Sequence, residues 1–249
     1  MDEFFAALDK VKAAGMPGLA FSGAPVWEGL TFNAMLMNVG GSELYLKVYR
    51  DRDTNAIASD AFKKVLNDCR QLKNYIDPGA TGRSWNDSTG MLITNKAGFQ
   101  VTGDWAKGEF KATGQVAGKE YGRIAGFGPK SPYLVGGDVF IFPKTKDPEA
   151  IKAQHLLAMV ITSNPTQLAF NLKKGSIPIR TDVDASAMDI CAQAGLAVMK
   201  DPSRQLPSPG MLINPDAAGA VQDVISKFWN NANPNLDEVV KGLQVAIRR

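Results

Sequence analysis

The sequence contains few of the residues that build metal and nucleophilic sites. Its 249 residues include one histidine, His155, and two cysteines, Cys69 and Cys191, which lie far apart in no metal-ligand spacing. A single histidine excludes zinc sites that need paired histidines. Cys69 continues an apolar helical stripe, which favours a buried free thiol, and a disulfide between the two cysteines stays open. We expect no metal and no cofactor.

The sequence also lacks an excess of either charge and any long apolar run. Its 28 Lys and Arg residues are balanced by 25 Asp and Glu residues, and both signs are interspersed. A net charge of +3 provides no electrostatic footprint for nucleic acid, so no nucleic-acid partner is expected. No apolar run approaches the roughly 18 residues of a membrane span, and no export signal is expected at the N-terminus.

Helical stripes alternate with short strand-like runs, which indicates the α/β class. Apolar spacing and capping residues predict helices beginning near Asp2, Trp27, Ser59, Asp87, Pro148, Pro165 and Pro215. Asp147, Asn164 and Asn214 each precede a proline and are the expected N-caps. Short apolar runs predict strands over 18–21, 97–101 and 135–142. Because the first helix begins at once, we expect the chain to be cut from a longer protein.

Polar and aromatic residues crowd into the segment Gly103–Phe110, which follows the strand-like run 97–101. A ligand cleft needs a few polar groups beside an apolar wall, and ligands of α/β sheets commonly bind at strand carboxyl ends. Trp105 is therefore predicted to line a pocket. Trp85 lies in the polar loop 81–86, where an aromatic residue is more suggestive of binding than one in a helical stripe.

Enzyme sites receive less support from the sequence. The glycine-rich segments 114–120 and 126–128 fail the phosphate-loop and dinucleotide patterns. His155 lies inside a predicted helix, which favours a surface or packing role over a nucleophile triad. Paired carboxylates for glycoside cleavage could come from Asp104, Glu109 and Asp138, so a carbohydrate-active hydrolase stays open as the alternative function.

Four segments together point to a known family. They are Trp85-Asn86, Gly103–Phe110, Gly136-Gly137-Asp138 and Lys174–Asp182, in that order. The chain resembles, over essentially its whole length, the glucose/mannose-type sugar-binding proteins of ABC importers. Its opening Asp2–Lys10 resembles a helix that lies well inside those proteins, after a first lobe. The resemblance implies a non-enzymatic, periplasmic protein that binds a monosaccharide or small oligosaccharide and delivers it to a membrane permease.

The resemblance also implies a fold and its boundaries. The family has the type II, maltose-binding-like fold, in which two α/β lobes close on a ligand by hinge motion. By this likeness, residues 1–137 and 182–249 build the second lobe. Residues 138–181 cross over and pack on a first lobe that is absent here. Apolar residues of the two helices in that span are then expected to associate with a first lobe supplied in trans, or with another copy of the chain.

Site residues carry over by position. Trp85 and Trp105 match the two second-lobe aromatics of the sugar pocket, Asp138 a carboxylate that accepts sugar hydroxyls, and Lys174 an ammonium donor. An indole covers the C–H face of a pyranose, and charged groups bind its hydroxyl rim. Further candidates are Trp27, Asp104 and Lys107.

Two positions depart from the family pattern. Family members often carry a histidine where this chain has Pro207–Met211, which removes one hydroxyl contact and weakens the case for glucose. Glu28 also stands where a glutamine is expected. A weaker hypothesis is a natural one-lobed scaffold that docks to a partner protein.

Overall fold

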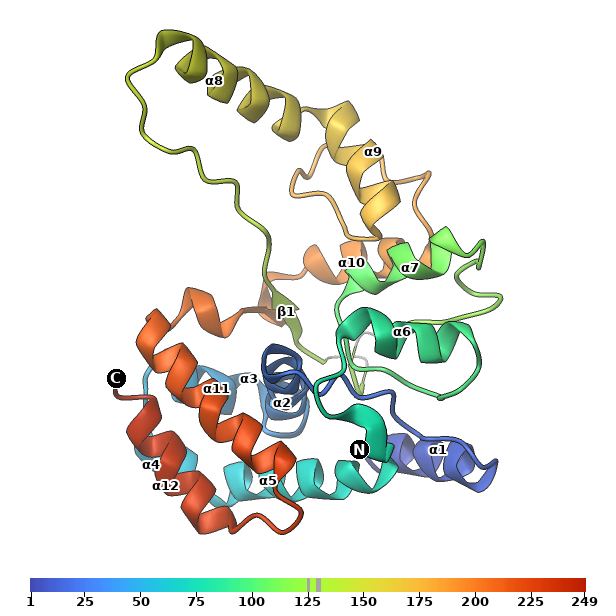
Figure 1. Ribbon diagram of the computed structural model, residues 1–249, viewed down its shortest axis with the longest axis vertical. Helices are drawn as coiled ribbons and strands as arrows, with labels where there is room; N and C mark the ends of the chain where they lie inside the picture. The colour runs from blue at the N-terminus through green and yellow to red at the C-terminus, as the bar shows by residue number, and fades with distance from the viewer. Residues whose placement is uncertain (125, 129–130) are drawn as a thin grey trace. The chain divides into compact units, whose positions relative to one another are not determined.

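The computed structural model describes residues 1–124, 126–128 and 131–249, most of them in helices and loops (Figure 1). The chain divides into two compact units. Unit 1 comprises Met1–Gly103, Ile124–Val135 and Asp201–Arg249, and unit 2 comprises Asp104–Arg123 and Gly136–Lys200. Because the chain leaves unit 1 twice and returns, both units are built from segments that are distant in the sequence.

Unit 1 is mainly helical. Its helices are α1 (Asp2–Ala13), α2 (Pro25–Val39), α3 (Gly41–Tyr49), α4 (Thr54–Ala58), α5 (Asp60–Leu72), α6 (Trp85–Ile93), α11 (Pro215–Asn230) and α12 (Leu236–Ala246). Its short 3-10 turns are η1 (Lys73–Tyr75), η2 (Pro78–Ala80), η4 (Pro202–Arg204) and η5 (Pro209–Met211). Strands β1 (Tyr133–Val135) and β2 (Gln205–Pro207) pair in parallel, with Leu134 opposite Leu206.

Three extended segments of unit 1 also lie in parallel. Leu19 pairs with Ile76 on one side and with Phe99 on the other, and Gly23 pairs with Thr81. The Leu19 amide donates to the Tyr75 carbonyl at 3.0 Å, and the Phe99 amide donates to the Gly18 carbonyl at 2.9 Å. The predicted strands at 18–21 and 97–101 are thus extended and paired, although only as single bridges. Parallel pairing requires helical crossovers between the segments, and α2 to α6 provide them.

The large hydrophobic core lies in unit 1. In α5, an apolar residue recurs every three or four positions, at Phe62, Val65, Leu66, Cys69 and Leu72, and all five are buried. Ser59 caps this helix by accepting from the Phe62 amide. Phe32 of α2 packs on that face against Phe62, with ring centroids 6.1 Å apart, and α3, α11 and α12 complete the core. Cys69 is a buried free thiol, as predicted, and Cys191 is free as well.

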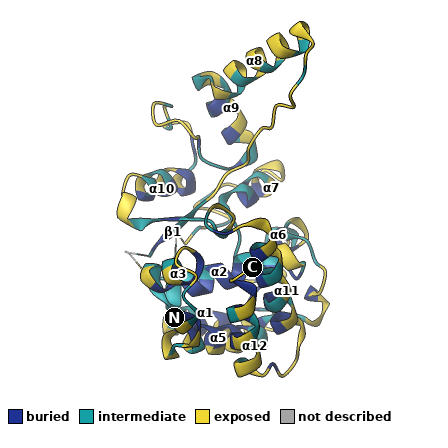
Figure 2. Cartoon of the chain, turned by 90° about the vertical axis from the view of Figure 1, so that its left-hand side faces the viewer, coloured by how far each residue is buried: buried dark blue, intermediate teal, exposed yellow. Residues whose placement is uncertain are grey.

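Unit 2 has little interior. It contains η3 (Asp104–Ala106), α7 (Lys107–Ala112), α8 (Pro148–Thr162), α9 (Asn164–Lys174) and α10 (Ile190–Met199). Phe110 of α7 stacks on Tyr121 with ring centroids 4.1 Å apart. No residue of α8 is buried, and Figure 2 shows that helix largely exposed. His155 lies on its surface, in agreement with the predicted surface role.

Some predicted elements are wrong in their bounds. The strand expected over 135–142 ends at Val135, because no described residue pairs with the extended run that follows it. Asn164 is not the N-cap of α9, since Ser163 holds that position and the side-chain nitrogen Nδ2 of Asn164 donates to the Asp182 carbonyl. Trp85 is the first residue of α6 rather than a loop residue, because Ser84 already caps that helix by accepting from the Asp87 amide. Asp147 and Asn214 are N-caps as predicted.

Candidate functional site

Tryptophans follow the carboxyl ends of all three parallel segments. The segment around Leu19 leads to Trp27 in the first turn of α2, and the segment around Ile76 leads to Trp85 at the start of α6. The third segment, around Phe99, leads to Trp105 in η3, where unit 2 begins. Carboxyl ends of parallel strands are where ligands bind in α/β folds. The topology therefore places each of these tryptophans at a position in the chain where ligand-binding residues commonly occur.

Trp27 and Trp85 form an aromatic corner within unit 1. Their ring centroids lie 6.4 Å apart and the ring planes meet at 65°, an edge-to-face arrangement. Both side chains are partly exposed. The Trp85 carbonyl accepts hydrogen bonds from Gln100 Nε2 at 2.8 Å and from Thr89 Oγ1 at 2.9 Å, so the backbone beneath the ring is held from two sides. Sequence reasoning named both tryptophans but had no signal for their contact.

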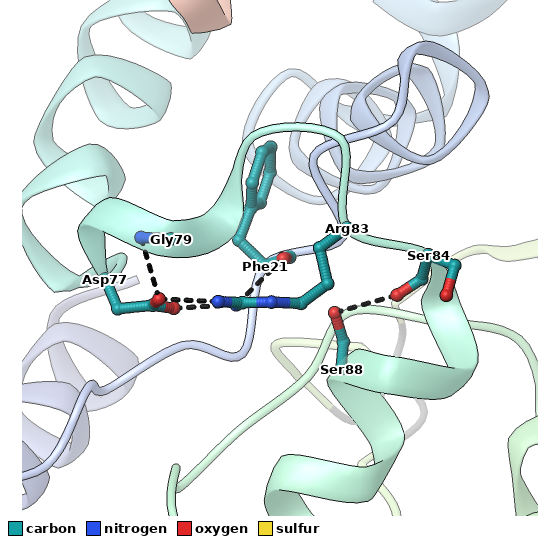
Figure 3. Close-up of polar contacts among 6 residues, drawn as sticks. All are labelled: Phe21, Asp77, Gly79, Arg83, Ser84 and Ser88. Carbon is teal, nitrogen blue, oxygen red and sulfur yellow. Dashed lines mark hydrogen bonds and ion pairs between the residues drawn. The ribbon is translucent and has the colours of Figure 1, made fainter.

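The loop before Trp85 is fastened by Arg83 (Figure 3). Its guanidinium donates to both carboxylate oxygens of Asp77, at 2.7 and 2.5 Å, and to the Phe21 carbonyl at 3.4 Å. Asp77 also accepts from the Gly79 amide at 3.1 Å. The hydrogen bonds from Arg83 are the main reason that the pKa of Asp77 is lowered. Sequence reasoning missed this pair, because the two residues are six positions apart and the turn η2 between them gives no sequence signal for the contact.

Three of the four predicted ligand residues belong to unit 2, namely Trp105, Asp138 and Lys174. Lys174 Nζ forms an ion pair with Asp138 Oδ2, although 36 residues separate them. The ammonium also lies 5.7 Å from the centre of the Phe170 ring. Asp138 is largely exposed, with 79% of its side chain accessible. The structure thus brings together the carboxylate and the ammonium predicted to recognise hydroxyl groups.

A close backbone contact connects Lys174 with the segment that contains Trp105. Gly108, three residues after Trp105, has room for no side chain, because a Cβ would come within 2.8 Å of the Lys174 carbonyl oxygen. Gly175 ends α9 in the left-handed region, at φ +85°. A Cβ at Gly175 would likewise be too close to the Gly108 backbone, 2.5 Å from its nitrogen. Lys111 Nζ donates to the Leu172 carbonyl at 2.7 Å. The start of α7 and the end of α9 are therefore held together within unit 2.

The further candidates Asp104 and Lys107 differ in accessibility. Asp104 is partly exposed, whereas Lys107 is buried with its Nζ 3.5 Å from Asp189 Oδ2. Burial lowers the pKa of Lys107, and the nearby Asp189 carboxylate opposes that shift. Asp189 is at the same time the N-cap of α10, accepting from the Ala192 amide. Lys107 is therefore engaged inside unit 2.

Glu28 is a buried carboxyl group beside Trp27. One of its oxygens, Oε1, accepts from Asn230 Nδ2 of α11 at 2.8 Å, and Oε2 has no hydrogen-bond partner among the described residues. Burial raises the pKa of Glu28, and hydrogen bonds from Ser226 and Asn230 only partly offset the effect. A glutamine, which the family pattern led us to expect here, would keep the acceptor without the charge.

We expect Glu28→Gln to stabilise unit 1 increasingly as pH rises. A carboxyl whose pKa is raised on folding contributes stability below its unfolded pKa and loses it as pH rises through its folded pKa. At pH 8 the gain in the free energy of unfolding should be on the order of 1 kcal/mol, and it should shrink towards pH 4.5. Urea unfolding at both pH values measures it.

Glu43→Gln is the matched control for Glu28→Gln. Glu43 is exposed in α3, and its hydrogen bond from Lys47 lowers its pKa, so its substitution should give the opposite sign of pH dependence. A gain for Glu28→Gln that is the same at both pH values would contradict the buried-charge explanation.

The described residues also form a hollow of about 300 Å³ beside α1 and α5. None of the predicted ligand residues lines it. Two of its carboxylates already have partners, since Asp68 accepts from Lys64 at 2.7 Å and Asp9 accepts from the Tyr75 hydroxyl at 2.8 Å. We assign no site to this hollow.

Comparison with solved structures defines the class of fold. The chain superposes on a protein described as "Chitin oligosaccharide binding protein" with a TM-score of 0.78 and 17% sequence identity, covering 99% of this chain and 63% of that one. At this identity the likeness concerns the fold alone. It confirms the predicted α/β fold of two-lobed periplasmic solute-binding proteins.

The sequence comparisons give the family. The sequence model described as "Bacterial extracellular solute-binding protein" matches residues 1–196, and the chain belongs to that family. A "Probable sugar-binding periplasmic protein" of Mesorhizobium japonicum is 37% identical over 252 residues, which cover 99% of this chain and 60% of the relative. A protein of the same description from Brucella melitensis is 34% identical over 255 residues, covering 99% of this chain and 59% of the relative. The chain thus spans about three fifths of the length of these relatives.

No helix in the described part of the chain has both the length and the apolar character that crossing a membrane requires.

Proposed function

We propose that this chain is part of a sugar-binding receptor of an ABC importer, which binds a monosaccharide or small oligosaccharide outside the cytoplasmic membrane and delivers it to a permease. Membership of the solute-binding family supports the transport role. The names of the relatives, which describe sugar-binding periplasmic proteins, support the ligand class and the location. The same names describe binding proteins, which favours a receptor over the hydrolase alternative.

The observation that carries the sugar proposal is the accessible ion pair of Asp138 and Lys174 in unit 2, the unit that also contains Trp105. Trp27 and Trp85 present partly exposed rings in unit 1, and Trp105 is partly exposed in unit 2. Asp138 and Lys174 supply one charged acceptor and one charged donor on the surface of unit 2. A pyranose matches this chemistry, because its C–H face stacks on an indole and its hydroxyls both donate and accept. The stacking contributes ~1 kcal/mol, so the charged groups are proposed to set the specificity.

We propose that the ligand is a monosaccharide other than glucose or a short oligosaccharide, with D-glucose as the comparison. The segment that replaces the family's histidine forms η5 (Pro209–Met211), in which Met211 is exposed. A thioether cannot donate a hydrogen bond to a sugar hydroxyl. Loss of that contact removes one determinant of glucose binding.

We also propose that residues 138–181 pack against a part of the protein outside this chain. Val139 and Ile141 are each 82% exposed in the extended run after β1, and Met159 of α8 is 69% exposed. Apolar surface of this extent marks an interaction site. The relatives have about two fifths of their length outside the match, which is enough for a first lobe. The assignment of 1–137 and 182–249 to the second lobe belongs to this proposal.

Calorimetric titration of D-glucose, D-galactose, D-xylose and cellobiose tests the function. Each sugar is titrated into the 249-residue chain and into a fusion in which the unmatched part of the Mesorhizobium japonicum relative precedes it. We expect micromolar binding of at least one sugar by the fusion, and much weaker binding by the chain alone. No binding by a folded fusion would sink the sugar proposal. Turnover of nitrophenyl glycosides that Asp138→Asn abolishes would favour the hydrolase instead.

Light scattering of the same two proteins tests the packing proposal. The isolated chain is expected to associate with itself and to bind an apolar dye, whereas the fusion is expected to be monomeric and to bind less dye. A strictly monomeric isolated chain that binds no dye would contradict the exposed apolar surface.

A further inference from the structure

We propose that Arg83 is a positioning residue for sugar binding, which sets the place and angle of the aromatic corner formed by Trp27 and Trp85. This inference rests on the proposed function, since it assigns the corner to the sugar. Arg83 touches neither indole in any contact described for it, and its effect is exerted through the backbone segments that lead into α2 and α6.

Arg83 and Asp77 form a bidentate, largely buried ion pair. The two terminal nitrogens of Arg83 donate to separate oxygens of Asp77, and one of them also reaches the Phe21 carbonyl at 3.4 Å (Figure 3). Only 14% of the Arg83 side chain and 18% of the Asp77 side chain are accessible. A bidentate pair with little exposure to water is both stronger and more directional than a single surface ion pair.

The contacts of Arg83 and two backbone hydrogen bonds join the two segments that precede Trp27 and Trp85. The Ala24 amide donates to the Arg83 carbonyl at 3.2 Å, and the Gly82 amide donates to the Gly23 carbonyl at 3.0 Å. Gly23 admits no side chain, because a Cβ there would lie 2.1 Å from the Ala80 carbonyl oxygen. The guanidinium adds side-chain hydrogen bonds between the same two segments, because it contacts both Asp77 and the Phe21 carbonyl.

Only a few residues of chain separate each ring from the point where the two segments are hydrogen-bonded. Ala24 is the N-cap of α2, and its carbonyl accepts from the Trp27 amide at 2.9 Å. Ser84 is the N-cap of α6, whose first residue is Trp85. Trp27 thus follows its cap by three residues, and Trp85 follows its cap by one. A rotation of either cap would turn a ring away from the other, and binding geometry tolerates only about 0.5 Å of such movement.

The test begins with the rings themselves, without sugar. The 249-residue chain is labelled with 5-fluorotryptophan, and its four ¹⁹F resonances are assigned with single Trp→Phe variants. Arg83→Met keeps the aliphatic stem of the side chain, and Asp77→Asn keeps an acceptor for the Gly79 amide, so either can be used if the other fails to fold. We expect the Trp27 and Trp85 resonances to shift or broaden. An unchanged spectrum overturns the proposal.

The second measurement is a double-mutant cycle on affinity. Arg83→Met is expected to weaken binding of the best sugar among D-glucose, D-galactose, D-xylose and cellobiose by about fivefold in the fusion, the loss expected when one stacked ring is misplaced. In a Trp85→Ala background the same substitution should change affinity less than about twofold, because its effect passes through that ring. Equal losses in both backgrounds indicate a general structural role and overturn the proposal.

Arg50→Met is the control for both measurements. Arg50 also makes a two-point contact, with the carboxylate of Asp51, but its side chain is 57% exposed and follows α3. It should leave the ¹⁹F spectrum and the affinity unchanged, and equal effects of Arg50→Met and Arg83→Met would overturn the proposal. If the wild-type fusion binds none of the sugars, the proposed function fails, and the ¹⁹F spectrum still decides whether Arg83 positions the corner.

Discussion

Lys174→Met is expected to weaken sugar binding by about tenfold to a hundredfold in the fusion, because a hydrogen bond to a charged group contributes ~1.5–3 kcal/mol. The ammonium is the only charged donor among the four carried-over residues, and it is held next to the Asp138 carboxylate. Removing it takes away a donor to the sugar and leaves the carboxylate without its ion-pair partner. Calorimetry with the sugar that the wild type binds best measures the loss.

Asp138→Asn separates the loss of the donor to the sugar from the loss of the ion pair. The amide keeps an acceptor for a hydroxyl and removes the charge, so we expect a smaller loss, on the order of tenfold. Because the two side chains contact each other, the double variant should lose less than the sum of the single losses. Lys173→Met is the control, since Lys173 lies next to Lys174 in the last turn of α9 and is exposed. An unchanged dissociation constant for Lys174→Met would contradict the proposed role.

Gly108→Ala is expected to destabilise unit 2 by about 1–3 kcal/mol, since the added methyl group has no space. It would lie 2.8 Å from the Lys174 carbonyl oxygen and 3.1 Å from that of Lys173, and backbone atoms cannot move aside as a flexible side chain can. The variant should expose the amides of α7 and α9 to hydrogen exchange. It should also weaken sugar binding, because Lys174 lies at the displaced contact.

Gly219→Ala is the matched control for this substitution. Gly219 lies inside α11, and a Cβ there would meet no atom within 4 Å. Alanine is the better helix former, so this variant should be stabilised by about 0.5–1 kcal/mol. If Gly108→Ala were as stable as the wild type, the close approach of α7 and α9 described here would be wrong.

The helices of this protein were predictable because their signals are local. The apolar stripe of α5 and its cap at Ser59 lie within one stretch of 14 residues, and the prolines after Asp147 and Asn214 mark helix starts by their own geometry. The strand expected over 135–142 failed for the opposite reason. A strand exists only with a hydrogen-bonded neighbour, and the described residues supply none after Val135.

For the candidate site, the residues could be predicted from the sequence, but the contacts among them could not. Residue types and their order were sufficient to name Trp27, Trp85, Trp105, Asp138 and Lys174, and also to place the chain in its family. Their roles in sugar binding stay predictions. The contacts among them could not be predicted from the sequence. Asp138 and Lys174 are 36 positions apart, and a helical crossover separates Trp27 from Trp85.

The sequence by itself determined the family, the helical stripes, the buried thiol of Cys69 and the residue types available for a ligand. The tertiary structure alone decided which of these groups touch. In it, Asp138 forms an ion pair with Lys174, Trp27 contacts Trp85 edge to face, and Arg83 donates to Asp77 and to the Phe21 carbonyl. Capping and periodicity act between residues a few positions apart. The contacts of Trp27, Trp85 and Arg83 depend on how helical crossovers return the chain to the same edge of three parallel segments, and the contact of Asp138 with Lys174 joins residues 36 positions apart within unit 2.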